Sequence, residues 1–264
     1  METTPFEEKT LEAIEDCKGA VKHCAKNAIY HLEKAWLIAD IDLEMAIFRG
    51  ITAEEEVASS LFYTLKNQKY KNSNKLGFKE HTSKQAVIPY IKSVIHNLSE
   101  FNKHNNSLFG TPYLQHVIHD HRKAMSLNFS IKSINGVASP IPPLHFNIAY
   151  EETGQVLTFG DTFEKICQGE QFSTALKYIK HIAGERNKLL YADNSGRSQV
   201  SGDLTGYLNQ QKEKIFTLLH IILLIDPWIN EGHSAFVQQA VDGFLLLLEK
   251  IQADELTPPY SSNQ

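Results

Sequence analysis

Apolar residues recur at spacings of three and four through the first part of the chain, and this limits the possible folds more than any other feature. Because an α-helix turns once in about 3.6 residues, such spacing produces an apolar stripe along one helix face. We therefore predict one long helix over 6–39 that packs against a partner helix. The residues of the stripe are Ile14, Cys17, Val21, Cys24, Ala28, Leu32, Ala35 and Ala39.

Two local signals predict a helix boundary shortly after this stripe. A shorter helical piece over 40–48 is expected to end at Gly50, since glycine commonly follows a helix C-terminus. Thr52 and Glu55 then form the pattern of a capping box, in which each side chain accepts from the other residue's backbone amide. The pattern predicts a new helix over 53–67.

Helical spacing continues through most of the remaining chain. A helix over 84–103 is expected to be capped by Ser83 and kinked near its start by Pro89, because proline lacks the amide hydrogen of a helix interior. Further helices are predicted over 113–125, 173–191, 203–225 and 233–251, with Asp226-Pro227-Trp228 between the last two.

The apolar spacing changes from helical to alternating near residue 126. Leu127, Phe129 and Ile131 alternate with polar residues, and the alternation resumes in the segments 144–150 and 157–159. Alternation of this kind predicts strands with one buried face. We predict a mainly α fold in a single domain over 1–253. It is a helical bundle with a small antiparallel β insertion at 126–160, followed by a disordered polar tail over 254–264.

Composition indicates a soluble globular protein rather than a membrane protein or a protein that coats nucleic acid. The chain has 264 residues and a formal net charge of -5. Its longest apolar stretch, Ile215–Ile225, is interrupted by Thr217 and His220 and is too short to span a bilayer. An acidic balance argues against general coating of nucleic acid but allows a local basic site.

The N-terminal residues and the cysteines predict a cytoplasmic location. Residues Met1–Lys9 are acidic and lack the apolar segment of a secretory signal. Cys17, Cys24 and Cys167 are an odd number without metal-ligand spacing. Cys17 and Cys24 are expected to be small core residues in a reducing compartment. The chain has no glycine-rich phosphate loop, and we expect neither a metal nor a cofactor.

The segment Glu185–Asp193 contains the strongest candidate for a functional site. In a helix, Asn187 and Tyr191 are neighbours on one face, and Arg186 is turned about 100° from Asn187 toward the apolar stripe. A guanidinium there must be paired or lie at the rim of a cleft. Either Arg186 holds a phosphate that Asn187 orients, or it only bonds a buried carboxylate at the end of the helix.

This combination of residues resembles the signature of the HEPN superfamily of helical domains. That signature is an arginine, commonly followed by asparagine, and then a histidine a few positions later. Arg186 and Asn187 match it, and Tyr191 stands where the histidine would be. The Ala-rich first helix and the stretch Ala53-Glu54-Glu55 are similar to HEPN-like proteins of phage abortive-infection systems.

The resemblance implies a HEPN-like helical bundle that forms a homodimer and acts on RNA in a toxin or antiphage-defence setting, with a partner protein or antitoxin. Many members of the superfamily are metal-independent endoribonucleases, whereas others only bind RNA or a partner. In this chain Arg186 would hold the scissile phosphate, Asn187 would orient it and Tyr191 would stand at the proton-transfer position. A tyrosine pKa near 10 makes a poor base at pH 7, so a catalytically inactive interaction module is the alternative.

Three further groups have both a functional and a structural interpretation. His116 and His119 would share one face of a helix over 113–125 and could bind a metal, with His121 on another face, but a polar helix flank is favoured. Lysines in the segment 66–84 could approach RNA while two aromatic rings stack on bases, or the segment could be a solvated loop. The lysines assigned to RNA are Lys79, Lys84 and Lys188, and the aromatic residues are Tyr70 and Phe78.

The three consecutive acidic residues Glu54, Glu55 and Glu56 have two interpretations of equal weight. One of them, with Glu55 as the assigned site residue, is the acidic partner of Arg186. Alternatively, they cap a helix N-terminus, where negative charge is stabilised by the helix dipole.

Overall fold

The computed structural model describes residues 1–104, 110–131, 135–145, 189 and 202–256. Within these residues the protein is mainly α-helical, with a small three-stranded antiparallel sheet. Apart from residue 189, the predicted helix over 173–191 lies outside the described residues, and so do its motif residues Arg186, Asn187, Lys188 and Tyr191. The strands predicted after residue 145 also lie outside them.

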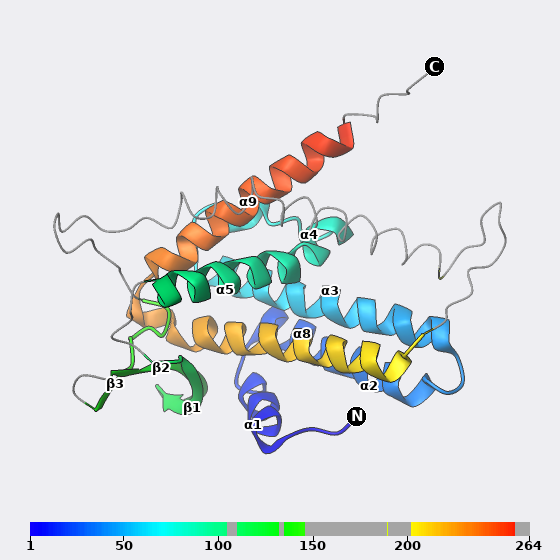
Figure 1. Ribbon diagram of the computed structural model, residues 1–264, viewed down its shortest axis with the longest axis horizontal. Helices are drawn as coiled ribbons and strands as arrows, with labels where there is room; N and C mark the ends of the chain where they lie inside the picture. The colour runs from blue at the N-terminus through cyan, green and yellow to red at the C-terminus, as the bar shows by residue number, and fades with distance from the viewer. Residues whose placement is uncertain (105–109, 132–134, 146–188, 190–201, 257–264) are drawn as a thin grey trace.

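Three long helices form the centre of the fold: α2 (Gly19–Ile38), α3 (Leu43–Asn67) and α8 (Leu204–Ile225). Helix α3 packs against both α2 and α8, and the short helix α1 (Pro5–Ile14) lies across α8 (Figure 1). Small residues on the facing surfaces, including Ala25, Ala28, Ala53 and Ala58, allow the helices to approach closely.

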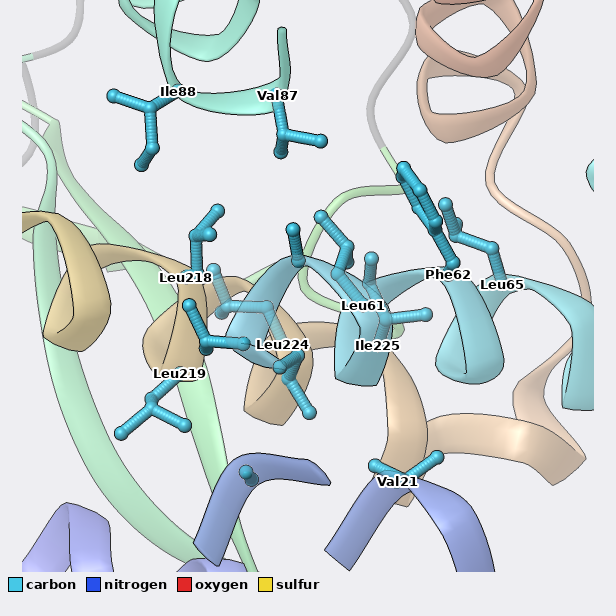
Figure 2. Packing of buried hydrophobic residues seen from close by; sticks show 14 of the residues in the cluster. Val21, Leu61, Phe62, Leu65, Val87, Ile88, Leu218, Leu219, Leu224 and Ile225 are labelled. Carbon is cyan, nitrogen blue, oxygen red and sulfur yellow. The ribbon is translucent and has the colours of Figure 1, made fainter. Parts of the chain in front are cut away.

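Five shorter or later helices complete the helical part of the described chain. The 3-10 helix η1 (Ser73–Lys75) and the helix α4 (His81–Gln85) follow α3, and α5 (Val87–His104) comes next. After α8, the 3-10 helix η2 (Asp226–Glu231) leads into α9 (Ala235–Leu256). Figure 2 shows Val87 and Ile88 of α5 above apolar side chains of α3 and α8, so these helices share one hydrophobic core.

The first predicted helix is wrong as a single element, because the chain turns between Ile14 and Gly19. Gly19 has a φ of 56°, a left-handed conformation that glycine adopts without a side-chain clash. Cys17 is buried in the core with 3% exposure, as predicted. It lies in the turn between two helices, however, and not within a helix. The apolar residues therefore keep their helical spacing across the turn between α1 and α2, so the spacing alone does not show where the first helix ends.

The boundary predicted near Gly50 is also wrong, because α3 passes through it. Asp42 caps this helix by accepting from the amide of Met45, and the Thr52 hydroxyl donates to the carbonyl of Phe48 one turn earlier. A Cβ atom at Gly50 would lie 3.1 Å from the ring of Tyr207. Gly50 therefore allows α8 to approach α3 and does not end the helix.

The predicted helix over 113–125 is a β-hairpin. Strand β1 (Tyr113–His119) pairs with β2 (Arg122–Ile131), which pairs in turn with β3 (Gly136–Ala138), so the β region begins before residue 126. The turn residues Asp120 and His121 have φ values of 45° and 61°, as a type I′ turn requires. The sheet lies near α1 and the C-terminal end of α8 (Figure 1).

The later helices agree better with the sequence patterns. Helix α8 begins at Leu204, close to the predicted start at residue 203, and Asp203 is its N-cap. The helix predicted over 84–103 with Ser83 as its cap is wrong at its start, because Ser83 lies inside α4 and α5 begins at Val87, two residues before Pro89. The segment 66–84 is only partly a solvated loop, because Tyr70 and Leu76 are buried within it. Helix α9 continues to Leu256, so the first residues of the predicted disordered tail are helical.

Candidate functional site

Glu55 is the one residue of the predicted catalytic set that lies in the described part of the chain. It is in the middle of α3, with 4% exposure. Its Oε2 atom lies 2.8 Å from Nδ1 of His81, and its Oε1 atom accepts a hydrogen bond of 3.0 Å from Nε2 of Gln85. Both partners come from α4, where their spacing of four residues places them on the same helix face.

The two sides of this contact differ strongly in exposure. The side chain of Glu55 is 5% exposed, whereas that of His81 is 49% exposed. A carboxylate accepts hydrogen bonds, so Nδ1 of His81 carries the proton that Glu55 accepts. This tautomer leaves Nε2 of the imidazole as the ring atom that can take up a proton.

Glu54 points in a different direction and makes a buried ion pair. Its Oε2 atom lies 2.9 Å from Nζ of Lys214 in α8, and the two side chains are only 6% and 9% exposed. Successive residues of a helix are rotated by about 100°, which separates the two carboxylates. Glu54 therefore links α3 to α8, and Glu55 links α3 to α4.

The interpretation of these glutamates as helix caps is wrong, because α3 begins 11 residues before Glu54, at Leu43. Their alternative role, as acidic partner of Arg186, stays a prediction because that arginine lies outside the described residues. The neighbouring Glu56 interacts electrostatically with α2. It contributes to the raised pKa of Cys24, whose main cause is burial.

The lysines assigned to RNA differ in their surroundings. Lys79 is exposed, but Lys84 is half-buried and close enough to α2 to affect the pKa of Cys24. The predicted stacking of Tyr70 on bases is wrong, because its ring is 6% exposed and its hydroxyl accepts from the amide of Ser234. Phe78 packs on the core as well, with ring centroids 5.0 Å from Tyr63 and 5.7 Å from Phe62.

The histidines of the hairpin do not share a face. His116 and His119 are three apart in a strand, so they point to opposite sides of the sheet. His116 lies 3.1 Å from the Thr10 hydroxyl, while His119 stacks on Trp228 at 4.2 Å. Across the part of the chain that the structure describes, no three His, Cys, Asp or Glu residues are grouped to hold a metal.

His220, a partly buried histidine of α8 beside Phe6 of α1, is expected to make the stability of the fold depend on pH. Burial lowers the pKa of His220 to about 4 from its ordinary 6.5, with a further contribution from His116 and an opposing one from Glu7. Its Nε2 atom has no hydrogen-bond partner among the described residues, and Phe6 lies against the ring at 5.4 Å. Protonation of this imidazole is therefore unfavourable in the folded protein.

We expect the protein to lose roughly 2–3 kcal/mol of stability from His220 as the pH falls from 6.5 toward 4. In this window the unfolded chain binds a proton that the folded chain does not, so acidification favours unfolding. His220→Leu should flatten the fall, measured by urea unfolding at pH 7 and pH 5. His23→Leu at an exposed position is the control, and equal slopes for wild type and His220→Leu would contradict the expectation.

Comparison with known proteins identifies no relative of this chain. A scan against models of protein families, a search of curated proteins and a search of solved structures found no match. None of the helices in the described part of the chain combines the length and apolar character needed to cross a membrane.

The contact between Glu55 and His81 was not predicted from the sequence. The sequence assigns Glu55 to the site only as a partner of Arg186, and it assigns no site role to His81. The two residues are 26 positions apart. The chain between them folds through η1 and α4 and brings the two side chains into contact, and no local sequence pattern predicts this fold.

Proposed function

We propose that this chain is a HEPN-like protein that binds RNA and cleaves it without a metal ion. Arg186 holds the scissile phosphate and Asn187 orients it. Tyr191 donates a proton, because an ordinary tyrosine is protonated at pH 7. The protein acts as a homodimer, in a toxin or antiphage-defence setting that involves a partner protein or antitoxin.

The buried carboxylate of Glu55 is the observation that carries this proposal. A carboxylate is costly to remove from water unless polar groups compensate it, and here His81 and Gln85 do so. This built polar site lies in the Ala53-Glu54-Glu55 stretch on which the resemblance to abortive-infection proteins partly rests. Its partner residues His81 and Gln85 are close in sequence to Lys79 and Lys84. These two lysines, together with Lys188, would contact the RNA backbone.

The proposal is tested by incubating the purified protein with a mixed RNA pool, with and without EDTA. We expect cleavage in both conditions. Arg186→Ala should slow cleavage on the order of 100-fold, because a donor to the transition-state charge is lost. Arg197→Ala, at an arginine outside the motif, should cleave like the wild type. Equal cleavage by the wild type and Arg186→Ala would sink the assigned mechanism.

The second candidate is a catalytically inactive helical module that binds RNA or a partner protein. Tyr191 favours it, since the histidine of the superfamily motif is absent. Gel-shift binding of RNA by the wild type without any cleavage would select this candidate. In either case the proposed homodimer should sediment at twice the chain mass of 29.9 kDa.

A further inference from the structure

Strand β1 is an edge of the sheet, and its outer side pairs with no other element of the described chain. The strand order is β1-β2-β3, so β1 has a neighbour on one side only (Figure 1). His119 and Arg122 flank the two-residue turn as Cα partners. In such a hairpin the pair next to the turn exchanges both backbone hydrogen bonds, and bonded and unbonded pairs then alternate along the strands. The backbone N–H and C=O groups of Leu114, His116 and Ile118 therefore point away from β2.

This edge lacks the features that usually prevent an edge strand from pairing with another chain. Those features are charged residues, proline, a bulge or a very short strand. Strand β1 has seven residues and contains no Asp, Glu, Lys, Arg or proline. The opposite edge, β3, has only three residues, and Pro140 follows it closely. A further strand can therefore add to the sheet beside β1 but not readily beside β3.

The side chains of β1 leave the outer edge accessible. Ile118 is 70% exposed, although isoleucine is among the residues most often buried. Leu114 packs against the hydrophobic core, and Nε2 of His116 lies 3.1 Å from the hydroxyl of Thr10 in α1. Side chains stand roughly perpendicular to a sheet, so this contact places α1 over a face of the sheet and not along its edge.

We propose that two copies of this chain form a dimer by pairing their β1 strands in antiparallel orientation. A two-fold axis at His116 places Leu114 opposite the partner's Ile118 and Ile118 opposite the partner's Leu114. The outward backbone groups of the two strands then exchange about six hydrogen bonds. The two three-stranded sheets become one continuous sheet. This contact is the interface of the homodimer proposed above, and it rests on that part of the proposed function alone.

The strand is complementary to itself about this axis, as a two-fold interface requires. Opposite apolar side chains stabilise paired strands, and the half-buried Leu114 would meet the exposed isoleucine of the partner. Like charges placed opposite each other would destabilise the pair, but β1 has no acidic or basic residue besides histidine. His116 would lie opposite its own copy. Burial and the nearby Lys9 lower its pKa, so both imidazoles are uncharged at pH 7.

The first test compares substitutions in the full-length chain by sedimentation. Ile118→Lys places a charge on the edge, whereas Ile141→Lys changes an apolar residue that is 63% exposed and lies outside β1. We expect the wild type and Ile141→Lys to sediment at twice the chain mass of 29.9 kDa, and Ile118→Lys at the chain mass itself. Ile118→Pro should also be monomeric, and the β1–β2 pairing should tolerate it because the lost N–H points outward. Circular dichroism should show equal helix content in all variants.

Hydrogen exchange resolved to single amides tests the strand register without any substitution. In the proposed dimer the amides of Leu114, His116 and Ile118 donate to the partner, while those of Gln115 and Val117 donate to β2. We expect dilution from dimer to monomer to speed exchange of the first three amides on the order of 10-fold or more. Exchange of the other two should stay unchanged.

The outcomes separate this contact from the function on which it rests. A wild type that is monomeric at every concentration overturns both the β1 contact and the proposed homodimer. A dimer that persists in Ile118→Lys and Ile118→Pro overturns only the β1 contact, as do outward amides that exchange equally fast in dimer and monomer. Outward amides protected in the monomer would mean that another segment of the same chain covers β1, which also overturns it. If the dimer depends on β1 but the protein neither binds nor cleaves RNA, the contact stands and the proposed action on RNA fails.

Discussion

Lys214→Met should lower the free energy of unfolding by about 3–5 kcal/mol, the cost of leaving a buried charge without its partner. Methionine keeps the length and apolar stem of lysine but removes the ammonium group. The carboxylate of Glu54, 6% exposed and 2.9 Å from that ammonium, would then lie between α3 and α8 without compensation. Urea unfolding at pH 7 measures the loss.

Two comparisons make this prediction specific to burial. Lys123→Met removes a lysine whose distance to Glu12 is also 2.9 Å, but the side chains there are 44% and 61% exposed. It should leave stability essentially unchanged, because surface pairs are screened by water. The double variant Glu54→Leu with Lys214→Met should recover most of the loss, since apolar replacement of a buried pair is often neutral. A double variant no more stable than Lys214→Met would contradict the explanation.

The regions that sequence patterns predicted well are those whose signals are local. Helix α8 has a continuous apolar stripe and the N-cap Asp203, whose side chain accepts from the amide of Gly206. Periodicity and capping depend on residues only a few positions apart, so they can be identified without knowing the tertiary fold. The mainly α class and the presence of a small antiparallel sheet could be predicted for the same reason.

Failures occurred where tertiary contacts decided between local signals. Gly50 and Thr52 carry the pattern of a helix end and a new cap, yet the ring of Tyr207 occupies the space that Gly50 leaves open. The hairpin turn at Asp120-His121 lacks the Asn-Gly or Asp-Gly signal that identifies most two-residue turns. The strands flanking it carry histidines whose spacing matched a helix face, which concealed their alternation.

The contacts of the candidate site could not be predicted from the sequence for the same reason. Glu54 and Glu55 are chemically identical in the sequence, and no pattern distinguishes the one that pairs with α8 from the one that pairs with α4. Because successive helix residues are rotated by about 100°, the two side chains point toward different helices. A single half-exposed histidine in a lysine-rich segment becomes notable only when the buried carboxylate behind it is known.

Arg122 is the second residue whose replacement should have a large effect, because it joins three separate parts of the fold. Its guanidinium pairs with the carboxylate of Asp226 at the start of η2 and donates to the carbonyl of Asp16 at 3.3 Å, in the turn between α1 and α2. Beside them, burial and Asp226 raise the pKa of Cys17 to about 12. The hairpin is therefore attached to the helical core through a largely buried polar contact.

Arg122→Met should lower the free energy of unfolding by roughly 3 kcal/mol, because Asp226, with a side chain only 12% exposed, loses its counter-ion. The hairpin should also detach before the helices unfold, which hydrogen exchange would detect as lost protection in β1 and β2. Arg122→Lys should recover only part of the loss, since an ammonium lacks the planar fork that reaches carboxylate and carbonyl together. Unchanged protection of the hairpin in Arg122→Met would mean that apolar packing of β2, through Ala124 and Met125, is sufficient to hold the sheet on the core.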